Sequence, residues 1–249
     1  MSLYFNLTLI FLICCLLAVI TVSLKNSDIY IGEKDEYGEP QGKGTLHTFE
    51  GIHYEGYFQD GKKDGKGKQK WPNGDAYDGD FVDDKMTGKG TLWRSNGHKY
   101  IGDFVGGKLQ GEGVLYAHTG EIIYEGNFTD SEYQGQGRSF FNGLTYIGEF
   151  FKGFPEGQGK TYILEEDGSA GLLVYDGWFF LGKFHGPGTK FMLDDDGTYY
   201  KIYDGTWKQA KRHGQGKAFD AKGTVIYDGK WNKGVMVSDD EDIDDLDEL

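Results

Sequence analysis

The stretch from Tyr77 to Gly97 reads YDGDFVDDKMTGKGTLWRSNG, and it decides the fold because its pattern recurs along the chain. It opens with a Tyr-x-Gly-x-Phe motif at 77–81, and residues two apart point to the same face of a β-strand. A Gly-x-Gly motif at 88–90 follows, after a polar stretch that is typical of a hairpin turn. Asn96-Gly97 then predicts the turn into the next copy. We therefore expect each copy to form two antiparallel strands.

The first motif, with Phe or Trp as its aromatic residue, occurs eight times, and Gly-x-Gly follows every copy except the last. The copies begin at Tyr54, Tyr77, Tyr100, Tyr124, Tyr146, Tyr175, Tyr203 and Tyr227. Their spacings are 23, 23, 24, 22, 29, 28 and 24 residues, a period that is typical of repeat architectures. A degenerate earlier copy begins at Tyr30 and has Lys34 in place of the aromatic residue.

The repeated glycines and aromatic residues predict a particular kind of core. Glycine weakens a strand unless something large passes close to its backbone, so we expect aromatic rings, each burying about 150–250 Å², to lie across the glycines. Five residues after the first glycine of each pair comes another regular, mostly aromatic position. It is occupied by Lys70 in the first full repeat, by Phe219 in the seventh, and in the five repeats between them by Trp93, Tyr116, Phe140, Tyr162 and Phe191. These five residues are the candidate partner-binding aromatic face, and the alternative is that their rings serve only the packing of the sheet.

The two motifs and their period of about 23 residues resemble MORN (membrane occupation and recognition nexus) repeats over residues 54–233, with a start as early as Tyr30. This resemblance implies an all-β fold, an elongated single-layer twisted antiparallel sheet with one β-hairpin per repeat. It also implies a binding platform that ties partners to membranes, the cytoskeleton or cilia.

We expect a hydrophobic signal or anchor segment at 1–24, a degenerate first repeat at 25–53, eight repeats at 54–234 and an acidic disordered tail at 235–249. Repeats five and six are longer than the others, with insertions around 165–169 and 194–197. Extra residues in a repeat array usually enlarge loops on one edge, so we expect longer loops there.

Composition and motifs exclude several classes of protein. With 41 Gly, only 4 Pro and 16% aromatic residues, the chain is not a helical bundle, a collagen or a Pro-rich disordered chain. Its formal charge of −14 opposes nucleic-acid binding, which depends on cations that neutralise phosphates. The sequence has no P-loop, GxGxxG or GxSxG motif, its six histidines show no metal-ligand spacing, and the residues after 234 are too few for a catalytic domain. We predict a non-enzymatic protein with no cofactor and no metal site.

The two ends of the chain resemble targeting signals, and the alternative for the C-terminal end is a solvated acidic tail. Residues 7–24, LTLIFLICCLLAVITVSL, have no charge and as a helix would span roughly 27 Å, close to the thickness of a bilayer core. They predict an N-terminal hydrophobic helix, either a signal peptide cleaved near 21–23 or an uncleaved anchor. Both cysteines lie in it, so the rest of the chain forms no disulfide. Residues 246–249, LDEL, approximate an ER-retention signal. We predict membrane association, in the ER lumen or on the cytoplasmic face.

Local charge and one sequon add two further hypotheses. Lysines in the first full repeat are candidate contacts for acidic phospholipids, although nearby carboxylates favour a merely solvated face. They are Lys62, Lys63, Lys66, Lys68 and Lys70, and a second basic cluster contains Lys208, Lys211, Arg212 and Lys217. Asn127 begins an Asn-x-Thr sequon and is a possible glycosylation site if the domain is lumenal.

The function predicted from the sequence is a non-enzymatic scaffold that binds a protein partner, a peptide or a helix, at or near a membrane. The alternatives are a phospholipid-binding membrane module and an ER-lumenal accessory protein retained by LDEL.

Overall fold

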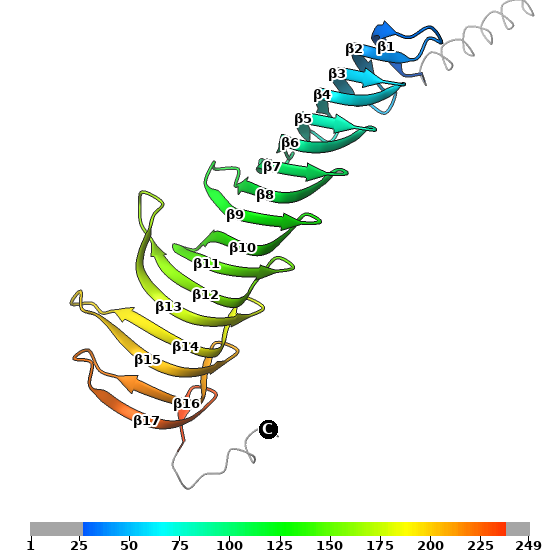
Figure 1. Cartoon of the computed structure of the whole chain (residues 1–249). Coiled ribbons are helices and arrows are strands. Elements are labelled where there is room, and N and C mark those ends of the chain that lie inside the picture. The colour runs from blue at the N-terminus through cyan, green and yellow to red at the C-terminus, as the bar shows by residue number, and fades with distance from the viewer. Residues whose placement is uncertain (1–26, 238–249) are drawn as a thin grey trace, which may run out of the picture. The chain divides into compact units, whose positions relative to one another are not determined.

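A computed structural model describes residues 27–237, which form 18 β-strands and no helix (Figure 1). The strands fall into two compact units, one ending at Gly107 and the other beginning at Lys108. The expected all-β class and antiparallel hairpins are confirmed. The expected hydrophobic helix at 1–24 and the acidic residues of 238–249 lie outside the described residues.

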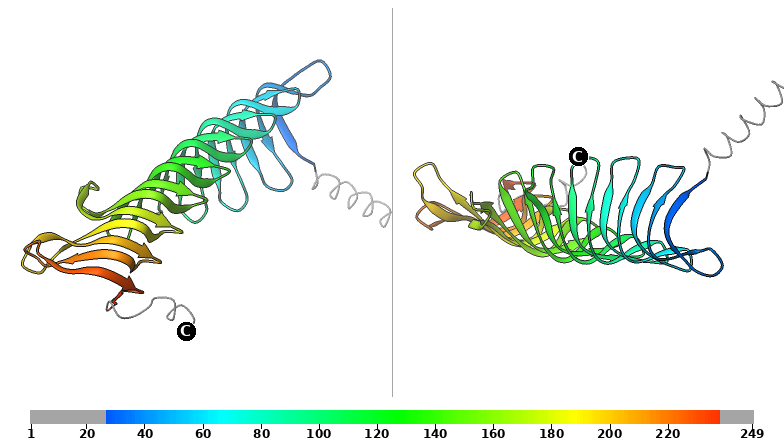
Figure 2. Two further views of the ribbon diagram at one scale, coloured as in Figure 1. Left: turned by 60° about the horizontal axis from the view of Figure 1, so that its bottom comes forward. Right: turned by 90° about the horizontal axis from the view of Figure 1, so that it is seen from above.

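Consecutive strands pair antiparallel within each unit, so every unit is a ladder of hairpins in chain order (Figure 2). The first unit contains β1 (Ile29–Lys34), β2 (Pro40–His47), β3 (His53–Gln59), β4 (Lys62–Lys70), β5 (Ala76–Val82), β6 (Lys85–Trp93) and β7 (Lys99–Val105). The second contains β8 (Lys108–Tyr116), β9 (Ile122–Thr129), β10 (Glu132–Phe141), β11 (Leu144–Phe151), β12 (Phe154–Leu164), β13 (Ala170–Phe180), β14 (Lys183–Leu193), β15 (Tyr199–Lys208), β16 (Lys211–Phe219), β17 (Val225–Asn232) and β18 (Val235–Met236).

The register aligns one glycine of each strand with one glycine of the next. The odd-numbered strands supply the glycine of the Tyr-x-Gly motif, and the even-numbered strands up to β16 supply the second glycine of Gly-x-Gly. In the first unit the paired glycines are Gly32, Gly44, Gly56, Gly67, Gly79, Gly90 and Gly102. In the second unit they are Gly113, Gly126, Gly137, Gly148, Gly159, Gly177, Gly188, Gly205, Gly216 and Gly229. A row of bare backbone therefore crosses the strands of each unit.

The tyrosine rings lie on this glycine row, as the sequence predicts. A Cβ atom added at Gly67 would collide with the ring of Tyr54, and one added at Gly159 would collide with the ring of Tyr146. Each tyrosine hydroxyl also donates a hydrogen bond to the carbonyl three residues ahead, for example Tyr54 to Tyr57 at 2.9 Å. We call this side of each ladder the ring face.

The rings of the ring face form a continuous edge-to-face array within each unit. Tyr54 contacts Phe58 of its own repeat and Phe81 of the next, both at 5.1 Å between ring centroids and nearly perpendicular. Edge-to-face pairs of this kind contribute about 0.5–1.5 kcal/mol beyond their buried area. Tyr54, Tyr77, Phe81 and Tyr124 are at most 1% exposed, so the core consists of the motif residues themselves.

A second layer of side chains covers the tyrosine rings from the solvent side. It comes from the residue two places before each Gly-x-Gly pair, and its chemistry varies from repeat to repeat. Tyr133 stacks on Tyr124 at 3.8 Å, and Phe184 stacks on Tyr175 at the same distance. In the first unit the ammonium of Lys63 lies 5.4 Å from the centroid of the Tyr54 ring.

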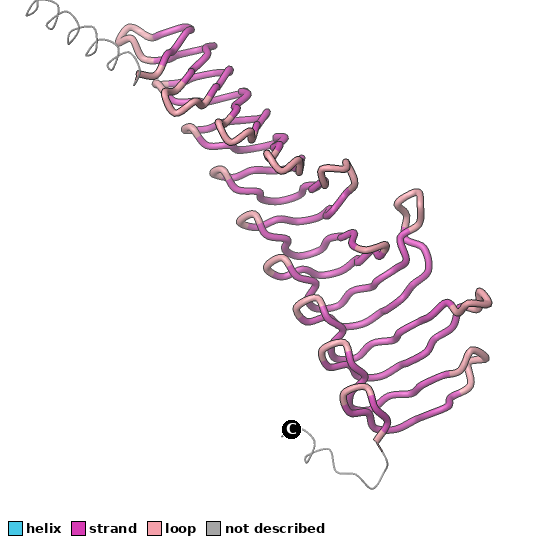
Figure 3. The backbone as a smooth tube through the Cα atoms, turned by 180° about the vertical axis from the view of Figure 1, so that it is seen from behind, coloured by secondary structure: helices cyan, strands magenta, loops and turns pink. Residues whose placement is uncertain are grey.

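The insertions of repeats five and six lengthen strands, so the expectation of enlarged loops is wrong. Strands β12 and β13 have 11 residues each, whereas β4 and β5 have 9 and 7. The turn at 165–169 is no longer than the turn at 71–75 (Figure 3). The extra residues of 160–175 can pair across the hairpin, and pairing satisfies backbone groups that a loop would leave to water.

Candidate functional site

The face opposite the ring face, here called the outer face, carries the residues that differ between repeats. In the first unit it is dominated by cross-strand ion pairs. Lys66 pairs with Asp80 at 2.8 Å, Lys68 with Asp78 at 2.9 Å, and Lys89 with Asp103 at 2.9 Å. On this face, these lysines and aspartates are partners of one another.

The second unit has a groove of about 720 Å³ across strands β10 to β14. Its lining residues are Gln134, Gly135, Gln136, Glu149, Phe150, Phe151, Glu156, Gly157, Trp178, Phe179, Phe180, His185, Gly186 and Pro187. All of them belong to one unit, and they come from five adjacent strands. This groove is the candidate functional site.

Glycines with a left-handed backbone shape the floor of the groove. Gly157 and Gly186 are the first members of their Gly-x-Gly pairs, and both have positive φ. A Cβ atom added at Gly157 would meet the carboxylate of Glu149, and one added at Gly186 would meet the Cβ atom of Trp178 at 3.4 Å. The absence of side chains there lets Glu149 and Trp178 lie over bare backbone.

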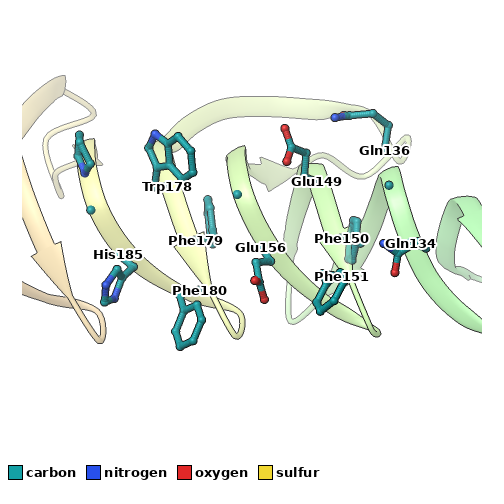
Figure 4. Close-up of a pocket in the computed structure, with 14 residues that line it drawn as sticks. Gln134, Gln136, Glu149, Phe150, Phe151, Glu156, Trp178, Phe179, Phe180 and His185 are labelled. Carbon is teal, nitrogen blue, oxygen red and sulfur yellow. The ribbon is translucent and has the colours of Figure 1, made fainter.

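Exposed aromatic side chains dominate the groove. Trp178 is 52% exposed, Phe180 49% and Phe151 46%. Figure 4 shows Trp178 and Glu149 on one side of the groove and Phe151 and Phe180 nearer the hairpin turns. Their solvent exposure shows that these rings are not needed for the core, whose members are buried.

Acidic groups accompany the aromatic rings. Among the described residues, no Lys or Arg forms an ion pair with Glu149 or Glu156. The ring centroid of His185 lies 5.6 Å from that of Phe180, and its buried Nδ1 atom has no hydrogen-bond partner within residues 27–237. The groove therefore offers two carboxylates that have no cation partner among the described residues, next to exposed aromatic rings. One of these rings already has a cation beside it, because the ammonium of Lys152 lies 5.4 Å from the centroid of the Phe151 ring.

The five aromatic residues predicted as a partner-binding face do not line this groove. Trp93 belongs to the first unit and is 42% exposed on the outer face. In the second unit, Phe140 lines a separate hollow of about 570 Å³ and lies 4.5 Å from the guanidinium of Arg138. Phe191 lines a third, apolar hollow of about 300 Å³ and stacks on Tyr199 at 5.7 Å. Tyr116 and Tyr162 are half-buried and line none of these three hollows.

The predicted lipid-contacting lysines are mostly engaged within the protein. Lys62 pairs with Asp83 at 2.7 Å, and Lys66 and Lys68 form the outer-face pairs given above. Lys63 points to the ring face and donates to Gln69 at 2.6 Å, and burial lowers its pKa. Lys70 lies at the end of β4 and is exposed.

The second basic cluster and the sequon are also placed by the structure. Arg212 lies 4.8 Å from the Trp231 ring centroid as a ring cover, and Lys217 pairs with Asp228 at 2.9 Å. Asn127 is exposed on β9, and its amide donates to the Gln136 carbonyl at 3.5 Å.

Residues 27–237 contain no group of three or more His, Cys, Asp or Glu side chains suited to hold one metal ion. Over the same range, no helix has the length and apolarity that a membrane crossing requires.

Sequence reasoning missed the groove because its residues occupy variable positions of the motif. Trp178 stands between Gly177 and Phe179, where Asp80 and Asp103 stand in earlier repeats. Phe151 and Phe180 directly follow the motif aromatic, where Val82 stands in an earlier repeat. The signal in the sequence was the occurrence of aromatic residues at variable outer-face positions of neighbouring repeats, with Trp178 where other repeats have Asp80, Asp103 or Glu149.

Comparison with known proteins identifies repeats in both units. The model of the MORN repeat family matches residues 54–76, 77–99, 100–121, 124–145, 146–162, 175–191 and 203–225. A comparison with curated protein sequences found no match. The fifth and sixth matches end at Tyr162 and Phe191, where the lengthened strands depart from the family pattern. Because the seven matches cover more than half of the chain and coincide with its hairpins, the chain belongs to the MORN-repeat family.

Proposed function

We propose that the chain is a non-enzymatic scaffold that binds a basic segment of a partner protein in the outer-face groove of β10–β14, at or near a membrane. The observation that carries this proposal is the conjunction of exposed Trp178 and Phe180 with Glu149 and Glu156, which have no Lys or Arg ion-pair partner among residues 27–237. Aromatic faces attract Lys and Arg side chains, by about 0.5–2 kcal/mol per contact. Interface hot spots are likewise enriched in Trp.

The shape of the groove supports an extended or helical segment. It crosses five strands, and its volume of about 720 Å³ lies in the range of binding clefts, about 300–1,000 Å³. Trp178 lies on β13, the fourth of the five strands, and Glu149 lies on β11 (Figure 4). A partner would bury the tryptophan and place its cations against the two carboxylates.

The alternatives draw less support from the described residues. A phospholipid-binding module would use the lysine cluster of β4, but Lys62, Lys66 and Lys68 already have aspartate partners. An ER-lumenal accessory role would use Asn127 and the C-terminal LDEL. Protease protection of intact microsomes, probed with an antibody to residues 238–249, distinguishes the two sides of the membrane.

The groove is tested with a labelled ten-residue peptide of alternating Arg and Leu, and a Glu-Leu peptide serves as its control. In fluorescence anisotropy, we expect the full chain to bind the basic peptide and Trp178→Asp to weaken binding at least tenfold, as for a hot-spot residue. The substitution makes the chain more acidic, so purely non-specific attraction would strengthen binding instead.

The matched control is Tyr57→Asp, at the equivalent position of the first unit. Tyr57 is 50% exposed, so its replacement should leave both stability and peptide binding unchanged. Equal binding by the wild type and the Trp178→Asp variant would reject the groove as the site. Glu149→Gln with Glu156→Gln should weaken binding a few-fold and reduce its dependence on salt.

A further inference from the structure

Two histidines that are six residues apart in the sequence meet on the outer face of the first unit. His47 ends β2, His53 begins β3, and the register places them directly opposite each other. Their Nδ1 atoms are 3.2 Å apart, and their ring centroids are 4.5 Å apart at 38°.

The turn between the two histidines fixes their approach. Thr48 N–H donates to the Ile52 carbonyl at 2.9 Å, and Gly51 N–H donates to the Thr48 carbonyl at 2.9 Å. The hydroxyl of Thr48 accepts a further bond from Ile52 N–H at 3.0 Å. The two rings are therefore held together by the backbone.

The spacing of the two nitrogens suits a metal ion. Zinc binds histidine nitrogens at about 2.0–2.1 Å, and two such ligands at a tetrahedral angle are about 3.3 Å apart. The observed separation of 3.2 Å, at which one Nδ1–H can donate to the other Nδ1, is close to this value, so a metal ion would replace the shared proton. Neutral imidazole is a preferred ligand of Zn²⁺, Ni²⁺ and Cu²⁺.

We propose that His47 and His53 bind one divalent transition-metal ion through their Nδ1 atoms, with water completing the coordination. His47 is exposed and His53 half-buried, so solvent reaches the remaining positions. With two protein ligands the site is weaker than a four-ligand structural zinc site. Bound metal would cross-link β2 to β3 and stabilise this hairpin.

The neighbours of the pair set its affinity. Ile29 lies opposite His47 on β1, and Lys70 lies opposite His53 on β4. The ammonium of Lys70 repels a cation, and its removal should strengthen metal binding. Lys70→Gln therefore serves as a variant that moves the affinity in the opposite direction to loss of a ligand.

The experiment is isothermal titration calorimetry of the full chain in detergent micelles with ZnCl₂, NiCl₂ and CuCl₂ near neutral pH. We expect one ion per chain at the site, with Cu²⁺ bound more tightly than Zn²⁺. His47→Asn and His53→Asn should each weaken binding at least tenfold, whereas Lys70→Gln should tighten it several-fold. His118→Asn, which alters an exposed histidine of the second unit, should have no effect.

A second readout separates loss of the site from loss of the fold. Saturating Zn²⁺ should raise the melting temperature of the wild type and of His118→Asn but not that of His47→Asn or His53→Asn. Each variant should melt at the wild-type temperature in the absence of metal, because neither ring belongs to the core. If His47→Asn and His53→Asn retained the wild-type affinity, or if the wild type bound no metal saturably, the proposal would be overturned.

Discussion

The cores of the two units are built in the same way, whereas their outer faces differ. In both, tyrosine rings lie on a glycine row and meet phenylalanine or tryptophan edge to face, as Tyr77 meets Phe81 and Tyr203 meets Trp207. On the outer face, the first unit places Asp80 opposite Lys66, whereas the second places Trp178 beside the bare backbone of Gly186. The motif residues therefore specify the ladder, and the residues between them are free to specify a binding surface.

The difference between the two outer faces has a simple physical cause. Strand side chains alternate between faces, so the positions between Tyr, Gly and Phe never enter the core. A change at such a position costs little stability, and the outer face can vary from repeat to repeat. The ring face cannot, because each ring contacts the rings of two repeats, as Tyr146 contacts Phe150 and Phe179.

The largest expected effect is unfolding at alkaline pH, and we expect it in both units. Unfolding of only one unit would contradict the similarity of their cores. Burial raises the pKa of Tyr54 and Tyr100 in the first unit, and of Tyr124 and Tyr203 in the second, to about 12. The protonated phenol is the form that the fold stabilises, so the stabilisation is complete below pH 10, the ordinary phenol range. It is lost as the pH rises from 10 through 12.

We therefore expect alkaline unfolding of both ladders between pH 10 and 12. Phenolate absorbance and far-UV circular dichroism, followed together, should change in the same pH range. Phenolate formation near pH 10 with an unchanged dichroism spectrum would show that the rings ionise without loss of the fold, contrary to a shared buried core.

The second effect concerns the glycine row in each unit. Gly67→Ala and Gly159→Ala place a Cβ atom into the rings of Tyr54 and Tyr146, and overpacking of this kind costs up to about 3 kcal/mol. The control is Gly143→Ala, where a Cβ atom meets nothing within 4 Å and only the positive φ of 73° opposes the substitution. That conformation costs about 1–2 kcal/mol.

Urea unfolding of the three variants measures these differences. Equal losses for Gly67→Ala and Gly159→Ala, both larger than that for Gly143→Ala, would support one packing principle for the two units. A loss at Gly67 or Gly159 no greater than at Gly143 would mean that the rings move aside, and the glycine row would not be a constraint.

The sequence predicted the parts of this fold that repetition makes visible. Alternation in Tyr77, Gly79 and Phe81 predicted the strand and its core face, and the Gly-x-Gly motif predicted bare backbone beneath rings. It did not reveal that Lys63 covers the Tyr54 ring, because a lysine beside acidic residues is typical of a solvated surface. The face on which a side chain lies depends on the register of its strand. A backbone irregularity between Gly56 and Phe58 changes the register of β3 with β4 near Lys63.

The candidate sites were harder to predict than the fold for a related reason. Trp178 occupies a position that shows no constraint in the repeat pattern, so its exposure became evident only with the neighbouring strands in place. His47 and His53 are separated by a turn, and only the register of β2 and β3 brings their rings together. Sites built across strands depend on pairing that a linear pattern does not contain.

The smallest expected effect sharpens the contrast between the outer faces. The side chain of Lys66 is 72% exposed where it pairs with Asp80, and an exposed ion pair contributes about 0–1 kcal/mol. Lys66→Gln should therefore shift the urea midpoint only slightly, and the shift should shrink further in 1 M NaCl because salt screens the pair. A loss above 1 kcal/mol that persists in 1 M NaCl would contradict this. The paired charges of the first unit would then hold its ladder together, and its outer face would not be free to vary as that of the second unit has done at Trp178.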